Sequence, residues 1–458
     1  TKEVDQTFLP SAISEIGAAI VGPTVKGPAL VPTVVSSYSE YQALFGDSFK
    51  SGSDYYQYLT SHTAENYLKN SDTLTVVRIL DDAFLHASAM VPTGSFDGTT
   101  YTGSSGDYSA IGIEGGSFKL HTLTHGSIMN NTTPSNVNGY SGGTQTGTNG
   151  ILVDSGSVHN LRWEVSSQNP KKGTFTLLIR KGDDSTKRKQ ILETWNNVSL
   201  DPNSSNFISK IIGDQMTVLK GSGTSDPYLQ PSGSYPNKSK YVRVEVTLPT
   251  VDYLDENGNL RDNAASASLP GLNSGSFAGG NDGWIGFDAK GEQQGGSGQT
   301  FFYNSIDNTN TQGYTPGTAN QGKTAYEDAL NLLSNQDEYD INLILIPGLM
   351  DSLGTHQSII TKAIDVCEDR GDCFVVVDPT AYGDALTTST TRGDARDSNY
   401  AAMYWPWVQV PDNQVGTPRW VPPSVVMGGI YAFNDKVAHP WFAPAGLNRG
   451  GIDVAIQA

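Results

Sequence analysis

The stretch INLILIPG (341–348) decides the fold class, because it is an almost unbroken apolar run that ends in Pro-Gly. Such a run is typical of a strand buried on both faces of a parallel sheet. A second run, CFVVVDP (373–379), follows THQSIITKAIDVCEDRG (355–371), in which apolar residues recur at helical spacing. We expect this helix to take Thr355 as its N-cap and to end at Gly371. Strand, helix and strand in this order predict a parallel pair covered by a helix.

The beginning of the chain has the same α/β character. The expected strands are AAIVG (18–22), VPTVVSS (31–37) and LTVVRIL (74–80). SYSEYQALFG (37–46) reads as a short helix with Ser37 as its N-cap and Gly46 as its end. The apolar spacing from 55 to 68 predicts a second helix.

Between these two parts lies a long segment of different composition, rich in Gly, Ser, Thr and Asn. Its expected strands are FKLHTLTH (118–125), GTFTLLIRKG (173–182) and KYVRVEVTLP (240–249), and one helix is expected near 204–219. We therefore predict an α/β fold, mixed α+β overall, whose discontinuous core is interrupted by a β-rich insertion. The expected division is an N-terminal arm at 1–20, core at 21–85, one or two protruding domains at 86–300, and core again at 301–458.

Composition limits the classes of partner. The chain has 458 residues, with 47 acidic and 29 basic residues and a net charge of −18. This excess of negative charge disfavours nucleic acid and anionic membranes as partners. No apolar run of membrane-spanning length and no secretory leader is visible. Cys367 and Cys373 do not have zinc or redox spacing, and we expect two buried free thiols.

The sharpest chemical motif is GTANQGKT (317–324), which fits the phosphate-binding pattern with Gly317, Gly322, Lys323 and Thr324. Asp378, at the end of an apolar strand, has the position of a magnesium ligand. A phosphate loop follows a strand directly, but the preceding NTNTQGYTP (308–316) is polar. We interpret the motif as a return linker whose Thr324 caps the next helix, and we expect no cofactor. The alternative is a P-loop nucleotide hydrolase using Lys323, Thr324 and Asp378.

Other constellations carry less chemistry. His121 and His125 are expected on one face of a strand without a third ligand, so no metal site is predicted. Asp81 and Asp82 read as a solvated strand end. Lys187, Arg188 and Lys189 place positive charge in the insertion of an acidic chain. The preferred interpretation is a solvated hairpin face, and the alternative is a complementary subunit contact. With no catalytic group supported, assembly is the expected function, and a β-rich surface adhesin is a further alternative.

Several stretches of the sequence, in their order along the chain, resemble those of the contractile-tail sheath proteins of phages. The phrases are GAAIVGPTVKGPALVPTVVSSYSEYQALFGD (17–47), YLTSHTAENYLKNSDTLTVVRIL (58–80), GTFTLLIRK (173–181), ETWNNVSLDPNSSNFISKIIGD (193–214), GGNDG (279–283), AYEDALNLLSNQDEYDINLILIPG (325–348), YWPWVQV (404–410), VPPSVVMGGIYAFND (421–435) and HPWFAPAGLNRGGI (439–452). The positions that match the family pattern are Gly22, Pro23, Gly27, Pro28, Phe45, Gly46, Arg78, Pro347, Gly348, Pro422, Pro423, Ser424, Pro440, Trp441, Pro444, Ala445 and Gly446.

The resemblance implies a structural protein rather than an enzyme. Family members form stacked rings around a tail tube and contract to drive the tube through the host envelope during genome delivery. The implied partners are further copies of the chain and the tail tube, baseplate and tail terminator proteins, with no nucleic acid, membrane insertion or cofactor. The implied location is the virion, after synthesis in the host bacterial cytoplasm. Candidate subunit contacts are Phe8, Leu9, Ile13, Lys187, Arg188 and Lys189. Relative to the family, we expect a shortened N-terminal arm and no C-terminal tube-facing domain on this chain.

Overall fold

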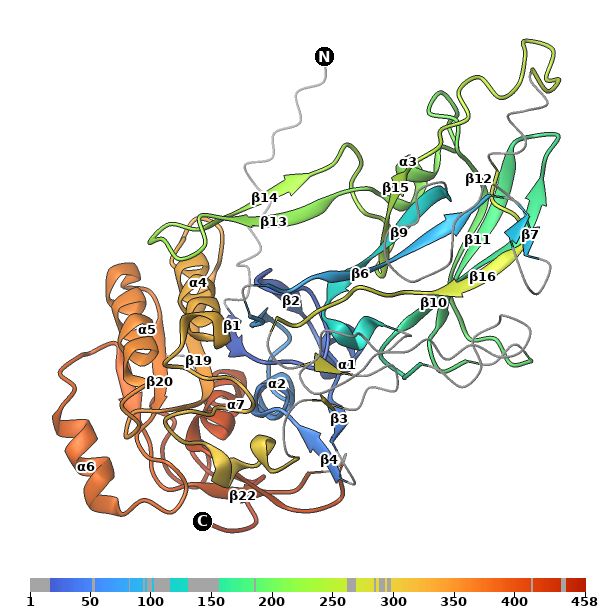
Figure 1. Cartoon of the computed structure of the whole chain (residues 1–458). Coiled ribbons are helices and arrows are strands. Elements are labelled where there is room, and N and C mark those ends of the chain that lie inside the picture. Colours follow the sequence, from blue (N-terminus) through green and yellow to red (C-terminus); the bar gives the residue numbers. More distant parts are fainter. Residues whose placement is uncertain are drawn as a thin grey trace.

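The computed structural model describes most of the chain. The described residues are 17–51, 54–81, 83–93, 95–96, 101–102, 116–130, 156–184, 187–261, 269–283, 286–287, 293–294, 298–412, 415–437 and 442–458. Two bodies are visible, an α/β core and a β-rich insertion (Figure 1). Across the described residues, the helices are all too short or too polar to cross a membrane.

A six-stranded sheet forms the centre of the core. Its order is β2 (Thr33–Val35), β5 (Leu74–Arg78), β1 (Gly17–Gly22), β19 (Ile341–Met350), β20 (Phe374–Asp378) and β21 (Ala401–Met403). Only β2 runs antiparallel to its neighbour, and the other strands are parallel. Because β1 lies between β5 from the first part of the core and β19 from the second, the strand order reverses at β1 and β19. In open α/β sheets such a reversal marks the crevice where ligands bind.

Helices cover both faces of this sheet. On one face, α4 (Lys323–Leu333) and α5 (Gln357–Arg370) pack on Ala19, Val21 and Ile344. On the other face, Ala18 and Ile20 pack against α1 (Tyr38–Phe45), α2 (Leu59–Leu68) and α7 (Pro423–Val437). Successive side chains of a strand point to opposite faces. That is why the central strands are apolar at consecutive positions rather than only at alternate ones.

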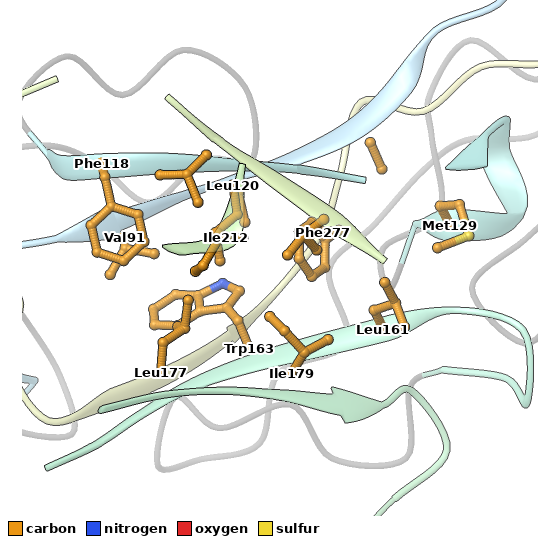
Figure 2. Packing of buried hydrophobic residues seen from close by; sticks show 14 of the residues in the cluster. Val91, Phe118, Leu120, Met129, Leu161, Trp163, Leu177, Ile179, Ile212 and Phe277 are labelled. Carbon is orange, nitrogen blue, oxygen red and sulfur yellow. The ribbon is translucent and has the colours of Figure 1, made fainter. Parts of the chain in front are cut away.

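The insertion is a sandwich of two antiparallel sheets. One has the order β12 (Ile191–Ser199), β11 (Thr174–Lys181), β10 (Leu161–Asn169) and β16 (Asn273–Ser276); the other has β15 (Val242–Val246), β9 (Gly116–His125) and β6 (His86–Pro92). The short helix α3 (Ile208–Ile212) closes one edge of the same apolar core. Trp163 lies at the centre of this core between Phe118, Leu177 and their neighbours, as Figure 2 shows.

Smaller elements complete the described chain. The two-stranded pairs are β3 (Ser48–Ser51) with β4 (Asp54–Gln57), β7 (Ser95–Phe96) with β8 (Tyr101–Thr102), β13 (Met216–Lys220) with β14 (Tyr228–Ser232), β17 (Gly286–Phe287) with β18 (Gln293–Gln294), and β22 (Val408–Val410) with β23 (Arg419–Val421). The remaining helical pieces are α6 (Leu386–Asp394), η1 (Ser127–Met129), η3 (Gly298–Phe301), η4 (Tyr303–Ser305) and η5 (Ala319–Gln321).

The predicted fold class is confirmed, and some element boundaries are wrong. The helix predicted over 55–68 is shorter, because Tyr55 and its neighbours form β4 against β3. The helix expected near 204–219 is reduced to α3, and β13 begins at Met216. Ser37 and Gly46 bound α1 as predicted, and both cysteines are buried free thiols as predicted. The residue limits 21–85, 86–300 and 301–458 remain our proposed division of the chain.

Candidate functional site

The loop that fits the phosphate-binding pattern does not have the geometry of one. It is preceded by turns rather than by a strand, and it contains the single turn η5 before α4. Its own backbone amides are already used inside the loop, because Thr318 N donates to Thr315 O, Gln321 N donates to Thr318 O, and Lys323 N also donates to Thr318 O. Amides bonded in this way are not free to surround a phosphate. The geometry therefore disfavours the nucleotide hydrolase.

Two predicted helix caps are wrong. The N-cap of α4 is Gly322, whose φ is 124°, so Thr324 already lies inside the helix. The N-cap of α5 is His356 rather than Thr355, while Gly371 ends that helix in the left-handed conformation as predicted. In both places the preceding turn, and not a side-chain oxygen, fixes the first helical residue: neither N-cap makes a side-chain capping bond.

Lys323 is expected to be replaceable. Its Nζ lies 3.7 Å from Glu327 Oε1 one helical turn away, and both side chains are 34% exposed. Such pairs contribute about 0.5 kcal/mol or less. We expect Lys323→Ala to change the free energy of unfolding by no more than this, and neither protein to bind ATP and magnesium in equilibrium dialysis. Saturable ATP binding that disappears in the variant would restore the hydrolase.

Asp378 serves a helix instead of a metal ion. It ends β20, and its carboxylate accepts hydrogen bonds from Ser424 N at 2.9 Å and Ser424 Oγ at 2.6 Å. Ser424 is the second residue of α7, so the carboxylate satisfies an amide at the start of that helix. No group of three or more potential metal-ligating side chains occurs among the described residues. The Pro-Pro-Ser sequence (422–424) thus begins α7, and its serine connects that helix to β20 of the central sheet.

Burial makes Asp378 a source of pH dependence. Removal from water raises its pKa from 3.8 to about 7, while the two bonds from Ser424 act in the opposite direction. The folded protein therefore binds this proton more tightly than the unfolded chain, so the contribution to stability is complete below pH 3.8 and is lost as the pH rises through about 7.

We expect the free energy of unfolding of the wild type, relative to that of Asp378→Asn, to fall by about 4 kcal/mol between pH 4 and pH 8. Urea unfolding of both proteins across this range measures the difference, in which the titration of all other groups cancels. A difference that stays constant with pH would contradict the raised pKa.

Thr311 and Gln312 lie beside the strand reversal. Thr311 Oγ1 donates to Gly348 O at 2.6 Å, and Gln312 Nε2 donates to Pro347 O at 3.3 Å. On the opposite side, Gln312 Oε1 accepts from Leu59 N at 2.7 Å. Gly348 has a φ of 97°, and a Cβ there would lie 2.5 Å from Gln312 Nε2. The glycine at 348 therefore allows the return linker to approach the end of β19, beside the position where α/β enzymes bind their ligands.

Arg78 joins three of the phrases that the sequence singled out. It is fully buried at the end of β5, and its Nη1 donates to Gly27 O at 2.7 Å and to His125 O at 2.8 Å. Its Nη2 lies 3.8 Å from Asp282 Oδ1, and Asp282 accepts from Ser127 Oγ at 2.6 Å. Gly27 belongs to the core and the other partners to the insertion. Arg78 is thus the joint between the two bodies.

The other family-like positions of the core occupy turns and element ends. Gly22 and Pro23 end β1, and Pro28 follows the Gly27 carbonyl that Arg78 binds. Phe45 O accepts from Lys26 N, and Gly46 N donates to Gln42 O, so the Phe-Gly and Gly-Pro phrases are adjacent.

The C-terminal family-like positions are only partly described. Pro422 O accepts from Val425 N, and Pro423 begins α7. Pro444, Ala445 and Gly446 lie in an irregular segment before the turn at 447–449, and Gly446 O accepts from Gly450 N. Pro440 and Trp441 lie outside the described residues, as do Phe8, Leu9 and Ile13.

The histidines form a hydrogen-bonded chain that the sequence did not reveal. His121 and His125 lie on β9 as predicted, but His121 has two close partners, since His86 Nε2 is 2.8 Å from its Nδ1 and Glu245 Oε2 is 2.8 Å from its Nε2. A carboxylate only accepts, so His121 Nε2 carries a proton, while His86 Nε2 lies between His121 Nδ1 and Arg243 Nη2, which is 3.4 Å away. Burial, assisted by Arg243, lowers the pKa of His121 to about 2, so this ring is neutral.

The remaining charged candidates lie apart from one another. Lys187, Arg188 and Lys189 are exposed between β11 and β12, and Lys189 Nζ lies 2.6 Å from Glu164 Oε1. Asp81 is 5% exposed, so its interpretation as a solvated strand end is wrong; its backbone amide donates to Asp282 O at the joint. Asp82 lies outside the described residues.

Comparisons with known proteins agree on one class. No protein-family profile matches the chain. The chain is 27% identical over 143 residues to the tail sheath protein of Enterobacteria phage T4, a match that covers 27% of this chain and 22% of that protein. It is 30% identical over 165 residues to the tail sheath protein of Vibrio phage KVP40, covering 29% and 23%. The matches thus span less than a quarter of the length of either relative.

Two solved structures are similar to the chain at lower identity. A sheath tail protein from Listeria innocua has a TM-score of 0.42 at 11% identity, covering 93% of this chain and 57% of that one. A sheath tail protein from Desulfitobacterium hafniense has the same TM-score and identity, covering 100% and 66%.

Proposed function

We propose, from the similarity of this chain to phage tail sheath proteins, that it assembles as stacked rings around a tail tube and contracts to drive the tube through the host envelope. Its relatives are named as tail sheath proteins, so a structural role in a phage tail and a place in the virion follow at the level of the family. We further propose that the chain forms rings, that these rings contract, and that they contact tube, baseplate and tail terminator proteins. We also propose that the chain is made in the host cytoplasm.

One observation of the geometry favours a structural role over catalysis. Thr311 and Gln312 lie beside the strand reversal, where their hydrogen bonds connect the end of β19 to the start of α2. A ligand at this position would have to displace three such bonds. The same segment returns the chain from the insertion to the core, so it fixes the architecture where an enzyme would keep an open site.

The proposal is tested by electron microscopy of the purified full chain together with sedimentation velocity over a range of protein and salt concentrations. We expect rings or hollow tubes. Monomers alone, under every condition and also after addition of a preformed tail tube, would contradict assembly by this chain.

The basic cluster provides a second arm of the same experiment. If Lys187, Arg188 and Lys189 contact an acidic neighbour, replacing all three with Gln weakens assembly and reduces its dependence on salt. Lys171 and Lys172, which are exposed on the turn between β10 and β11, supply the matched control. Equal assembly of both variants and the wild type would remove the cluster from the interface.

A further inference from the structure

The hairpin of β13 and β14 is a two-stranded element that leaves the insertion and reaches the core. Its strands pair only with each other among the described residues, and most of their side chains are exposed. In Figure 1 it runs from the neighbourhood of α3 to α4. Because an isolated two-stranded hairpin is marginally stable in water, it needs attachments at its ends.

At its base the hairpin is fixed to the insertion, since Lys238 N donates to Ile212 O of α3 at 2.8 Å and Val244 N of β15 donates to Gly213 O at 2.9 Å. Asp214 Oδ1 accepts from Ser234 N at 2.8 Å and from Tyr235 N at 2.7 Å. Asn237 Nδ2 donates to Gln215 O at 2.7 Å. These bonds hold the two strands together where they leave the sandwich.

At its tip the hairpin is seated on α4. Asp328 is 1% exposed, and its carboxylate accepts from Ser222 Oγ at 2.6 Å and from Gly223 N at 2.8 Å. Asn331 lies three residues further along the same helix face and donates from Nδ2 to Thr224 O at 2.9 Å. Leu219, near the end of β13, packs against the apolar core beneath α4 and α5. Burying a carboxylate destabilises the fold unless hydrogen-bond donors such as these are present. The site formed by Asp328 and Asn331, here called the seat, is therefore specific for this turn.

We propose that this hairpin is a clasp that fixes the orientation of the insertion on the core. Arg78 and an apolar contact of Val25, Phe49 and Tyr58 with the sandwich hold the two bodies together where the chain crosses between them. All of these contacts lie at one end of the insertion. The seat on α4 supplies a second, separate attachment. Two attachments at different places define the orientation, so the subunit moves as one body while both are closed. This inference does not depend on whether the chain forms a sheath.

Hydrogen–deuterium exchange on the full chain tests the clasp. In Asp328→Ala we expect amide exchange in 216–232 to rise at least tenfold, with the Gly223 amide most affected, and small-angle scattering to show a larger radius of gyration. Alanine favours helix, so α4 itself should persist. Ser222→Ala leaves the helix untouched and should give a smaller rise at the same amides. Glu327→Ala, on the neighbouring exposed position, is the control and should match the wild type.

Two results would overturn the proposal. One is hairpin exchange in Asp328→Ala and Ser222→Ala that equals that of Glu327→Ala. The other is a change of oligomeric mass in Asp328→Ala, measured by light scattering, because the seat would then hold the hairpin of a second copy. Failure of the wild type to form rings or tubes would contradict the proposed function without affecting either result.

Discussion

Replacing Arg78 with Met is expected to lower the free energy of unfolding by about 3 to 5 kcal/mol, since the change removes one partner of a buried charge pair. The guanidinium and the Asp282 carboxylate are each 1% exposed. Met fills a similar volume but leaves the carbonyls of Gly27 and His125 without their donor. Asp282 would then remain in an environment that already raises its pKa through burial. Urea unfolding and exchange at β5 and β9 measure the loss.

A surface pair of the same geometry is the control for this prediction. Arg261 Nη1 lies 3.8 Å from Asp252 Oδ2, and these side chains are 53% and 52% exposed. Arg261→Met should change stability by about 1 kcal/mol or less, because an exposed pair is weakened by solvent. Adding Asp282→Asn to Arg78→Met should restore part of the loss. Equal effects of Arg78→Met and Arg261→Met would show that Arg78 is not a joint.

Trp163→Ala is expected to cost about 3 to 5 kcal/mol, the usual loss for removing a large buried aromatic side chain. Trp163 is 2% exposed in the core of the sandwich, and its indole covers the backbone of Gly275 on the neighbouring strand. A Cβ on Gly275 would lie 2.7 Å from Trp163 Cζ2, so only glycine at this position leaves room for the indole ring. Hydrogen exchange should accelerate in β10, β11 and β9, while β19 and β20 should stay protected because their apolar clusters are separate.

Trp405→Ala is the matched control, because Trp405 is 45% exposed. A substitution of this kind at the surface is expected to change stability by about 0.5 kcal/mol. An unchanged midpoint of unfolding in Trp163→Ala, or equal loss of protection in β19, would contradict the independence of the two bodies.

The central sheet could be predicted because its signal is local. Strand 341–348 is apolar at nearly every position, Asn342 being the exception, and a sheet covered on both faces requires such a run. The errors lie where tertiary contacts outweigh local pattern. Tyr55 has helical spacing to its neighbours, yet it pairs with Lys50 across a hairpin. Thr324 and Thr355 are good capping residues, yet the turns before α4 and α5 set the helix starts elsewhere.

The candidate site could be predicted in its parts but not in its assembly. The sequence singled out Gly27, Arg78 and the GGNDG phrase as separate positions, and the structure brings them together although Asp282 lies about two hundred residues from Arg78. The role of Gln312 carries no local signal at all, because it depends on the carbonyl of Pro347 and the amide of Leu59. The role of Asp328 could not be predicted for the same reason, since its hydrogen-bond partners come from a hairpin of the insertion.

The place where the chain first enters the insertion has a practical consequence for protein engineering. Leu85 N donates to Asn281 O at 2.8 Å, and Asn281 N donates to Leu85 O at 3.1 Å, so the outgoing and returning strands leave the core side by side. Domains whose ends lie close together tolerate transplantation. A foreign domain grafted between these two points would remove His125 and the hairpin turn that Asp328 binds. A display design on this core therefore also has to replace Arg78 and Asp328 with uncharged residues.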